Sequence, residues 1–322
     1  MLPEIMYLGV VFLSVTTVGT IANLFLFTSY MLNVHAGHKI SSSTLIFTQL
    51  TLVHSIMLIS KGVPQTLQGL GWNNFLDDVG CKVVFYFRKV SEGLSVSLTC
   101  LLCTLQAITI SSSNSILAEL KVRLTQHSIP SYLFCWILNL LIEIPVPISA
   151  RGPRSSSNFT NAFDNMFCTS ESVMCVYLIM TTFRNVLYLG LMVLASVYMV
   201  LLLHKHHQHV QKIRSIKCSS RRQPETRATQ TILLLMSTFV SFYALMSIFA
   251  LFLSYFDQKS PWMLPTAIFL SLCYPTISPF LLFPILCRPT VISKPSSIPF
   301  LTLLTLTISR MFSPPTIPLP SS

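Results

Sequence analysis

The sequence predicts an all-α membrane protein, a seven-transmembrane helix bundle with its N-terminus outside and its C-terminus inside. Hydrophobic residues occupy 52% of the 322 positions, charged residues only 10%, and the mean hydropathy is +0.66, which is unlike a soluble domain. A helix needs about 20 mostly apolar residues to cross about 30 Å of hydrocarbon. Seven runs reach that length, and we expect spans at residues 5–32, 40–61, 81–112, 129–150, 173–203, 228–256 and 261–287.

The first three spans rest on runs without charged residues. The first run is too long for a cleavable signal peptide and lacks a basic segment before it, so we expect a signal anchor that is retained. The second run covers residues 40–60. The third is uncharged from Leu94 to Ala118, and a more polar extension carries it back to Cys81.

The last four spans differ in charge and proline content. The fourth and fifth carry one charge each, Glu143 and Arg184, whereas the sixth and seventh carry none. Pro275 and Pro279 are placed to bend the seventh span. We therefore expect one transmembrane domain over residues 1–287 and a Pro- and Ser-rich cytoplasmic tail, 288–322, whose apolar run of about 11 residues is too short to span a membrane.

The distribution of Lys and Arg predicts the orientation, because cytoplasmic connections retain these residues. With the N-terminus outside, the inner segments hold thirteen of them: Lys39, Lys121, Arg123, Lys205, Lys212, Arg214, Lys217, Arg221, Arg222, Arg227, Arg288, Lys294 and Arg310. The outer loops and span ends hold five, Lys61, Lys82, Arg151, Arg154 and Lys259. The net charge of +11 is thus mainly a topology signal, and we expect a lipid bilayer and no nucleic acid as partner.

Two features of the predicted outer surface agree with this orientation. The sequon at Asn158 lies between the fourth and fifth spans, where glycosylation occurs. Cys81 begins the third span at its outer end and Cys168 lies in that same outer loop, an oxidising compartment, so we favour a disulfide between them over two free thiols. The cysteines within apolar runs are expected to pack as small hydrophobic side chains: Cys100, Cys103, Cys135, Cys175 and Cys273.

Signatures of soluble enzymes are absent from the sequence. It contains no GxGxxG, GxxxxGK, HExxH or GxSxG motif, and no nucleophile is paired with a base in a water-accessible cleft, so we expect no enzymatic activity. Four histidines lie in "HKHHQHVQK" (204–212). We interpret this segment as a basic aqueous loop that repels cations and offers no acid or cysteine, and we therefore expect no metal and no cofactor.

Charged residues inside the spans are the candidates for a ligand site, because they are costly in lipid and usually face a cavity or a partner. At 1.5 Å per residue, Arg88 lies about 10 Å and Glu92 about 16 Å below Cys81, on one helical face. Arg184 lies about 16 Å down the fifth span and Glu143 about 10 Å from the outer end of the fourth. We expect these four to line a small organic ligand's pocket between spans three, four and five; the alternative is an internal ion-pair network that only joins helices.

Five separated blocks resemble a known family. They are "CKVVFYFRKVSEGLSVSLTCLLCTLQAITISSSNS" (81–115), "AELKVR" (118–123), "GLMVLASVYMVLLLHKHHQHVQ" (190–211), "PETRATQTILLL" (224–235) and "CYPTISPFLL" (273–282). In this order they are similar to type-1 vomeronasal receptors, within the rhodopsin-like G-protein-coupled receptors, over about residues 5–286. The resemblance implies a plasma-membrane chemosensory receptor for small pheromone-like or volatile molecules that signals through an inhibitory-type G protein.

The resemblance also implies where the heterotrimeric G protein binds. In this superfamily, outward movement of the inner end of the sixth helix admits the G protein, and Arg221, Arg222 and Arg227 lie at that junction. Plain positive-inside anchoring is an alternative that is compatible with coupling. Gln106 stands where most rhodopsin-like receptors carry an arginine at the end of the third helix, as in the vomeronasal family.

Two other functions share some of these features. A bitter-taste-type or other chemosensory receptor would have seven spans and small ligands but not the matching blocks. A transporter or channel would predict paired inverted repeats and discontinuous helices, and no internal repeat is apparent in the sequence.

Overall fold

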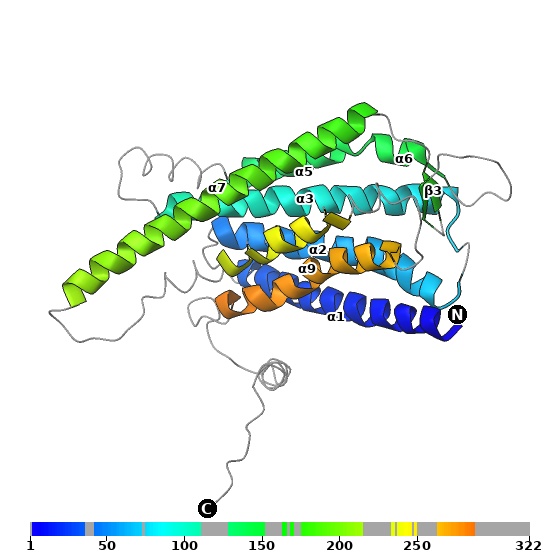
Figure 1. Ribbon diagram of the computed structural model, residues 1–322, viewed down its shortest axis with the longest axis horizontal. Helices are drawn as coiled ribbons and strands as arrows, with labels where there is room; N and C mark the ends of the chain where they lie inside the picture. The colour runs from blue at the N-terminus through cyan, green and yellow to red at the C-terminus, as the bar shows by residue number, and fades with distance from the viewer. Residues whose placement is uncertain are drawn as a thin grey trace, which may run out of the picture. The chain divides into compact units, whose positions relative to one another are not determined.

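The computed structural model (Figure 1) describes residues 2–35, 42–72, 75–110, 128–151, 163–165, 168–170, 175–214, 233–235, 237–246, 248–249 and 263–286. The chain divides into two units, Met1–Ile285 and Leu286–Ser322. Apart from the last residue of the final helix, every element described below lies in the first unit. The predicted tail, 288–322, lies outside the described residues.

The described elements are mainly long apolar helices. They are α1 (Leu2–His35), α2 (Ser42–Gly69), α3 (Asp78–Ile110), α5 (Ser128–Ile142), the short α6 (Pro145–Ser149), α7 (Cys175–Arg214) and α9 (Met263–Leu286). Six helical segments are long and apolar enough to cross a membrane, with α5 and α6 counted together, and a shorter apolar helix covers Leu233–Met246. The prediction of a helical membrane protein is confirmed to this extent, while a seventh full-length span and the orientation stay predictions.

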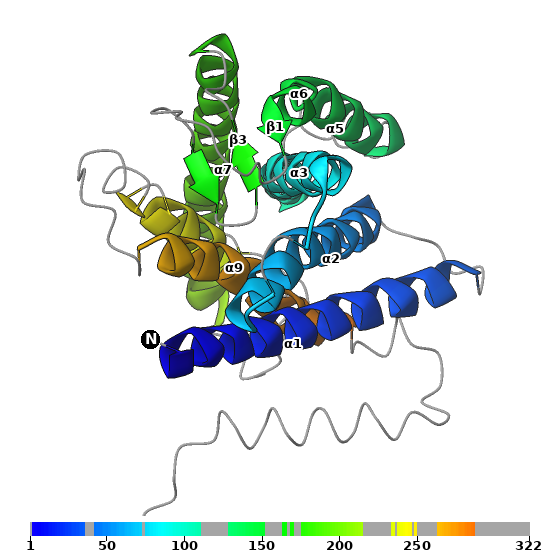
Figure 2. The same cartoon turned by 90° about the vertical axis from the view of Figure 1, so that its right-hand side faces the viewer.

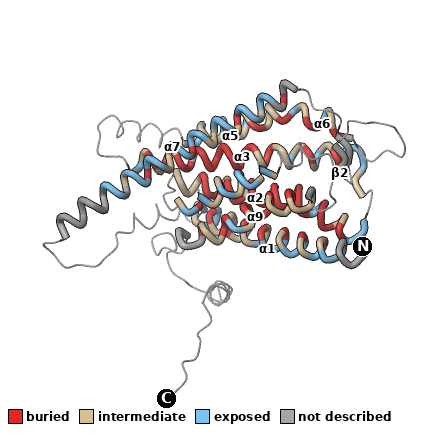
Figure 3. Tube along the Cα trace, in the orientation of Figure 1, coloured by how far each residue is buried: buried red, intermediate tan, exposed pale blue. Residues whose placement is uncertain are grey.

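Helix α3 contacts more of the other elements than its neighbours do. It packs against α2 on one side and against α5, α6 and α7 on others, while α1 packs against α2 (Figures 1 and 2). Its buried positions include many small side chains, among them Ser91, Ser95, Ser97, Thr99 and Cys103. Small residues let membrane helices approach closely, which explains why buried residues follow most of α3 in Figure 3.

Helix α9 is tied to the start of the chain by both apolar and polar contacts. Phe12 and Leu58 form a buried cluster with residues of α9. Proline at position 279 has no N–H, which leaves the carbonyl of Pro275, one turn earlier, without its usual intrahelical donor. The amide of Asn23 on α1 donates to that carbonyl at 2.8 Å. The proline that was expected to bend this helix therefore also supplies an acceptor for α1.

Helix α2 extends past the predicted end of its span at residue 61, to Gly69. A left-handed cap ends it: Gly71 has φ +88°, its N–H donates to the carbonyl of Gln68, and the following N–H donates to Leu67. This is the Schellman arrangement that glycine permits. Lys61, which was expected at the outer end of the span, therefore lies inside the helix and is buried.

The fourth predicted span is interrupted where prolines remove backbone donors. Because Pro145 has no N–H to donate to Leu141, that carbonyl accepts the N–H of Ile144 at 3.3 Å, in a tighter turn. α5 therefore ends at Ile142, and α6 begins at Pro145. Glu143 lies in the turn between them.

Helix α7 continues beyond the predicted limit of residue 203 to Arg214. The interpretation of the histidine segment as a loop was wrong, because the structure describes residues 204–214 as helix. No Gly or Pro stands between these positions, so nothing in the local sequence stops a helix that has already begun.

A small antiparallel sheet, which the sequence did not predict, lies near the first turns of α3. Its strands are β1 (Ala150–Arg151), β2 (Phe163–Asn165) and β3 (Cys168–Ser170), in the order β1-β3-β2. β1 contacts α3, and Ala150 joins Cys81 in a buried cluster. At the start of α3, the carboxylate of Asp77 accepts the N–H of Gly80 at 2.7 Å and caps the helix.

Candidate functional site

The four charged residues predicted to share one pocket lie in two separate clusters around α3. The Glu143 cluster joins α5 and α7 beside α3, and consists of Asn139, Glu143, Tyr177 and Arg184. The Glu92 cluster joins α2 to α3, and consists of Lys61, Arg88, Lys89 and Glu92. The closest charged partner of Glu92 is Lys61 on α2, and its place in a pocket between spans three, four and five stays a prediction.

The Glu143 cluster is a closed network of buried groups. Arg184 Nη1 donates to Glu143 Oε1 at 2.9 Å and to Asn139 Oδ1 at 3.2 Å. The other carboxylate oxygen of Glu143 accepts the hydroxyl of Tyr177. Glu143 is 1% exposed and Arg184 8%. One positive and one negative charge therefore neutralise each other away from water, and both carboxylate oxygens have donors.

Helix α3 leaves room for this network at Gly93. A Cβ atom built there would collide with Asn139 Oδ1 and would lie 3.0 Å from Arg184 Nη1. On the next turn of α3, Ser97 accepts a hydrogen bond from the amide of Asn139 at 3.2 Å. The absence of a side chain at residue 93 therefore lets α5 and α7 bring their polar groups against the α3 backbone.

The Glu92 cluster holds more positive than negative charge. Lys61 Nζ lies 2.5 Å from Glu92 Oε1 and Lys89 Nζ lies 3.2 Å from Oε2. Arg88 Nε lies 4.0 Å from Glu92 Oε1, as its position four residues earlier on the helix predicted. Three cations thus surround one carboxylate. The cluster is also more open, because the side chain of Lys89 is 43% exposed and that of Glu92 is 30% exposed.

Four members of these clusters were not predicted as site residues: Lys61, Lys89, Asn139 and Tyr177. Lys61 was missed because the end of α2 was placed eight residues too early, although the glycines at 69 and 71 are a helix-stop signal. Asn139 precedes Glu143 by four residues and Tyr177 precedes Arg184 by seven, so each pair shares a helical face. Looking for polar residues at those spacings would have found both.

A third group of polar contacts joins α2, α3 and α9. The sequence did not predict it. The two ring nitrogens of the buried His54 hydrogen-bond with Ser95 on α3 at 3.1 Å and Ser278 on α9 at 2.7 Å. Its ring also packs edge to face against Tyr274 at 5.2 Å, and Tyr274 packs in the same way on Phe239 of the shorter helix. His54 therefore links three helices and has both polar atoms satisfied.

The remaining predicted site residues are described only in part. Gln106 donates a hydrogen bond from its amide to Ser43 at 2.7 Å, joining the end of α3 to the start of α2. Cys81 is disulfide-bonded, and its pairing with Cys168 stays a prediction. The predicted coupling arginines and the sequon lie outside the described residues: Arg221, Arg222, Arg227 and Asn158.

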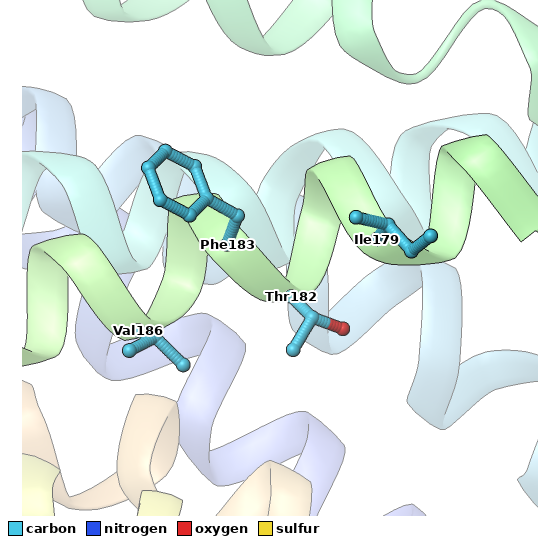
Figure 4. Close-up of a pocket in the computed structure, with 4 residues that line it drawn as sticks. All are labelled: Ile179, Thr182, Phe183 and Val186. Atoms are coloured by element: carbon cyan, nitrogen blue, oxygen red, sulfur yellow. The ribbon is translucent and has the colours of Figure 1, made fainter.

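A surface hollow on α7 is not part of either cluster. It is lined by Ile179, Thr182, Phe183 and Val186 (Figure 4), all from this one helix. These residues recur at helical spacing on a face that is largely exposed, whereas Arg184 is buried. The hollow is therefore a feature of the apolar outer face of α7, which suits contact with lipid.

The possible metal ligands and the thiols can be located in the part of the chain that the structure describes. No group of three His, Cys, Asp or Glu side chains is placed to hold a metal ion among those residues. Cys100, Cys135 and Cys273 have unbridged thiols within helices. Their surroundings agree with packing as small hydrophobic groups.

Comparison with known proteins shows what the chain is similar to. The model of the vomeronasal organ pheromone receptor family matches residues 6–295. Vomeronasal type-1 receptor 4 of Homo sapiens is 38% identical over 283 residues, which cover 87% of this chain and 93% of that protein. Vomeronasal type-1 receptor 1 of Homo sapiens is 34% identical over 277 residues, covering 85% and 78%. Olfactory receptor class A-like protein 1 of Danio rerio is 30% identical over 279 residues, covering 85% and 87%.

Proposed function

The chain belongs to the vomeronasal type-1 receptor family, a family of multi-pass membrane receptors and not of enzymes, and on that premise we propose that it detects a small organic molecule at the plasma membrane and activates a heterotrimeric G protein. The match over residues 6–295 is the observation that carries the proposal. We further propose that the ligand is pheromone-like or volatile and that the G protein is of the inhibitory type. The family resemblance supports both.

We propose that the ligand binds in the half of the bundle that holds the charged clusters, with Arg88, Glu92, Arg184 and Glu143 in or behind its wall. The distances support different roles for them. The Glu143 carboxylate and the Arg184 guanidinium satisfy each other and link the turn after α5 to α7. Arg88 and Glu92 are more open, so they are better placed to meet a ligand directly.

The test compares alanine variants at Arg88 and Arg184 in cells that also express a promiscuous G protein. A panel of small organic compounds is applied, and surface level is measured alongside the response. We expect Arg88→Ala to reach the surface and to respond less to an agonist, whereas Arg184→Ala is expected to lose surface level as well. A response that survives Arg88→Ala unchanged would remove this residue from the pocket.

We propose that the G protein binds at the opposite end of the bundle. There, Gln106 hydrogen-bonds to Ser43 and so joins the end of α3 to the start of α2. In the sequence, the arginines at 221, 222 and 227 lie between α7 and the helix Leu233–Met246. Charge reversal at the three arginines should weaken signalling and spare ligand binding. Alanine at Lys205 and Lys212, still within α7, controls for general loss of inner charge, since equal losses would indicate membrane anchoring alone.

The proposed orientation places the N-terminus, the small sheet, a glycan on Asn158 and a Cys81–Cys168 disulfide outside the cell. The packing of β1 against α3 and its pairing with β3, which begins at Cys168, supports a short path between the two cysteines. An N-terminal tag should stain intact cells, and Asn158→Gln should abolish a glycan-dependent gel shift. A C-terminal tag that stains without permeabilisation would contradict this orientation.

A further inference from the structure

The Glu92 cluster has a charge imbalance that its own residues do not remove. The charged side chains that act on Lys61 are those of Glu92, Arg88 and Lys89, and the same three cations act on Glu92. Within the described residues, one carboxylate is therefore shared by three cations. Charges held away from bulk water are costly when they are not matched by a partner of opposite sign, so the cluster has capacity for a further anion.

The hydrogen bonds of Arg88 identify where that anion would fit. Its Nε atom is buried and has no hydrogen-bond partner among the described residues, and at 4.0 Å from Glu92 it makes only a long ion pair. A guanidinium presents its donors in a planar fork that matches an oxyanion. An unfilled donor beside excess positive charge is the arrangement expected of an anion subsite that is completed by its ligand.

The groups beside Arg88 suit an anion with an apolar body. The guanidinium carbon lies 6.0 Å from the centre of the Phe85 ring. The exposed share of the Lys89 side chain, 43%, leaves one side of the cluster open. An inorganic ion would use only the charges, whereas an organic anion would also place an apolar group near the Phe85 ring.

From this geometry we infer that the Glu92 cluster is a subsite for the anionic end of an organic ligand, a carboxylate or similar oxyanion bound by Lys61, Arg88 and Lys89. The inference deepens the proposed function and rests on it for the view that the ligand is a small organic molecule. Glu92 then acts as a positioning residue. It holds the ammonium groups of Lys61 and Lys89 on either side of the subsite while the ligand supplies the missing negative charge.

The test measures direct binding to the full chain in lipid nanodiscs, which does not require signalling. The probes are naphthalene-2-carboxylate and adamantane-1-carboxylate, each compared with its neutral amide by the shift in thermal unfolding. We expect both carboxylates to bind more tightly than their amides. Arg88→Gln should weaken carboxylate binding about tenfold, the loss of one charge-assisted hydrogen bond, without changing amide binding, and Arg88→Lys should restore part of it.

A matched control is available on the same helix. Lys82→Gln removes one positive charge from α3 too, but Lys82 pairs with Asp78 at 2.9 Å, outside the cluster, so carboxylate binding should not change. Should Arg88→Gln fail to unfold cooperatively, Lys89→Gln replaces it, with a smaller loss of the same sign. Carboxylates that bind no better than their amides, or equal losses from Lys82→Gln and Arg88→Gln, would overturn the subsite.

The outcome for the subsite is separate from that for the proposed function. Anion-selective binding without any G-protein response would keep the subsite and contradict the receptor proposal. A G-protein response to neutral compounds alone, with no preference for carboxylates in the nanodisc measurement, would support the receptor proposal and contradict the subsite.

Discussion

The Glu143 cluster and the Glu92 cluster lie around the same helix, within one helical turn of each other, yet their charges are matched in different ways. In the first, a single carboxylate and a single guanidinium neutralise each other, and the hydroxyl of Tyr177 donates to the second carboxylate oxygen. In the second, one carboxylate is divided among three cations. The groups of the Glu143 cluster already have partners and few free donors for a ligand. The Glu92 cluster has excess positive charge, which favours binding of an anion.

The difference follows from where α3 places consecutive residues. Glu92 and Gly93 point about 100° apart on the helix, so the first faces α2 and the second faces α5 and α7. The long side chain at 92 reaches a buried lysine, while the missing side chain at 93 admits the polar groups of two other helices. Two adjacent residues thus give one helix two polar faces with distinct roles.

The largest effect is expected from breaking the matched pair. Arg184→Ala leaves the buried Glu143 carboxylate without its cation, and removing one partner of such a pair costs about 3–5 kcal/mol. The receptor should then reach the cell surface at a small fraction of the wild-type level. Thermal unfolding in detergent, followed with a thiol-reactive dye that reports exposure of Cys100 and Cys135, measures the loss directly.

Removing both charges together distinguishes pairing from ligand contact. The double variant Glu143→Gln with Arg184→Met leaves no unpaired charge and keeps a side-chain oxygen for Tyr177, so most of the stability should return. Full stability of Arg184→Ala alone, with loss of the agonist response only, would contradict the structural role and move Arg184 into the ligand contact surface.

A smaller loss is expected at the other end of the Glu143 carboxylate. Tyr177→Phe removes a hydrogen bond to a charged group, a change worth about 1.5–3 kcal/mol. Tyr86→Phe is the matched control, because that hydroxyl donates at 3.0 Å to the neutral carbonyl of Leu140, and a bond of this kind contributes about 0.5–1.5 kcal/mol. Equal shifts in the unfolding temperature of the two variants would contradict a stronger hydrogen bond at Tyr177 than at Tyr86.

Filling the space at residue 93 should destabilise the same network by crowding. The new methyl group of Gly93→Ala would meet Asn139 and Arg184, and overpacking of this kind costs about 1–3 kcal/mol. Gly190→Ala provides the control, since a Cβ there meets nothing within 4 Å, and alanine in a helix is favoured over glycine by about 0.5–1 kcal/mol. The two variants should therefore shift the unfolding temperature in opposite directions.

These clusters also show which contacts a sequence can predict. Arg88 and Glu92 were expected to be neighbours, and they are, because helical periodicity alone fixes contacts between residues four apart. The contact of Glu92 with Lys61 depends on which helices adjoin and how far α2 extends. The pairing of Ala150 with Ser170 likewise joins segments that no local periodicity relates. Six long apolar helices were predictable from hydropathy, but side-chain partners across helices required the fold.

The smallest effect is expected within the Glu92 cluster. It tests whether a buried lysine contributes more to stability than an exposed one. The Lys89 side chain is 43% exposed and reaches Glu92 at 3.2 Å, whereas the Lys61 side chain is 2% exposed and lies at 2.5 Å. An exposed ion pair contributes about 0–1 kcal/mol, and a long lysine can keep its ammonium hydrated by extending outward. Lys89→Gln should therefore change the unfolding temperature little, while Lys61→Gln should lower it clearly, because Glu92 loses its buried partner. Similar shifts for both would mean that Glu92 stabilises Lys61 and Lys89 to the same extent, whatever their exposure. The Lys61–Glu92 pair would then not be the main polar link between α2 and α3.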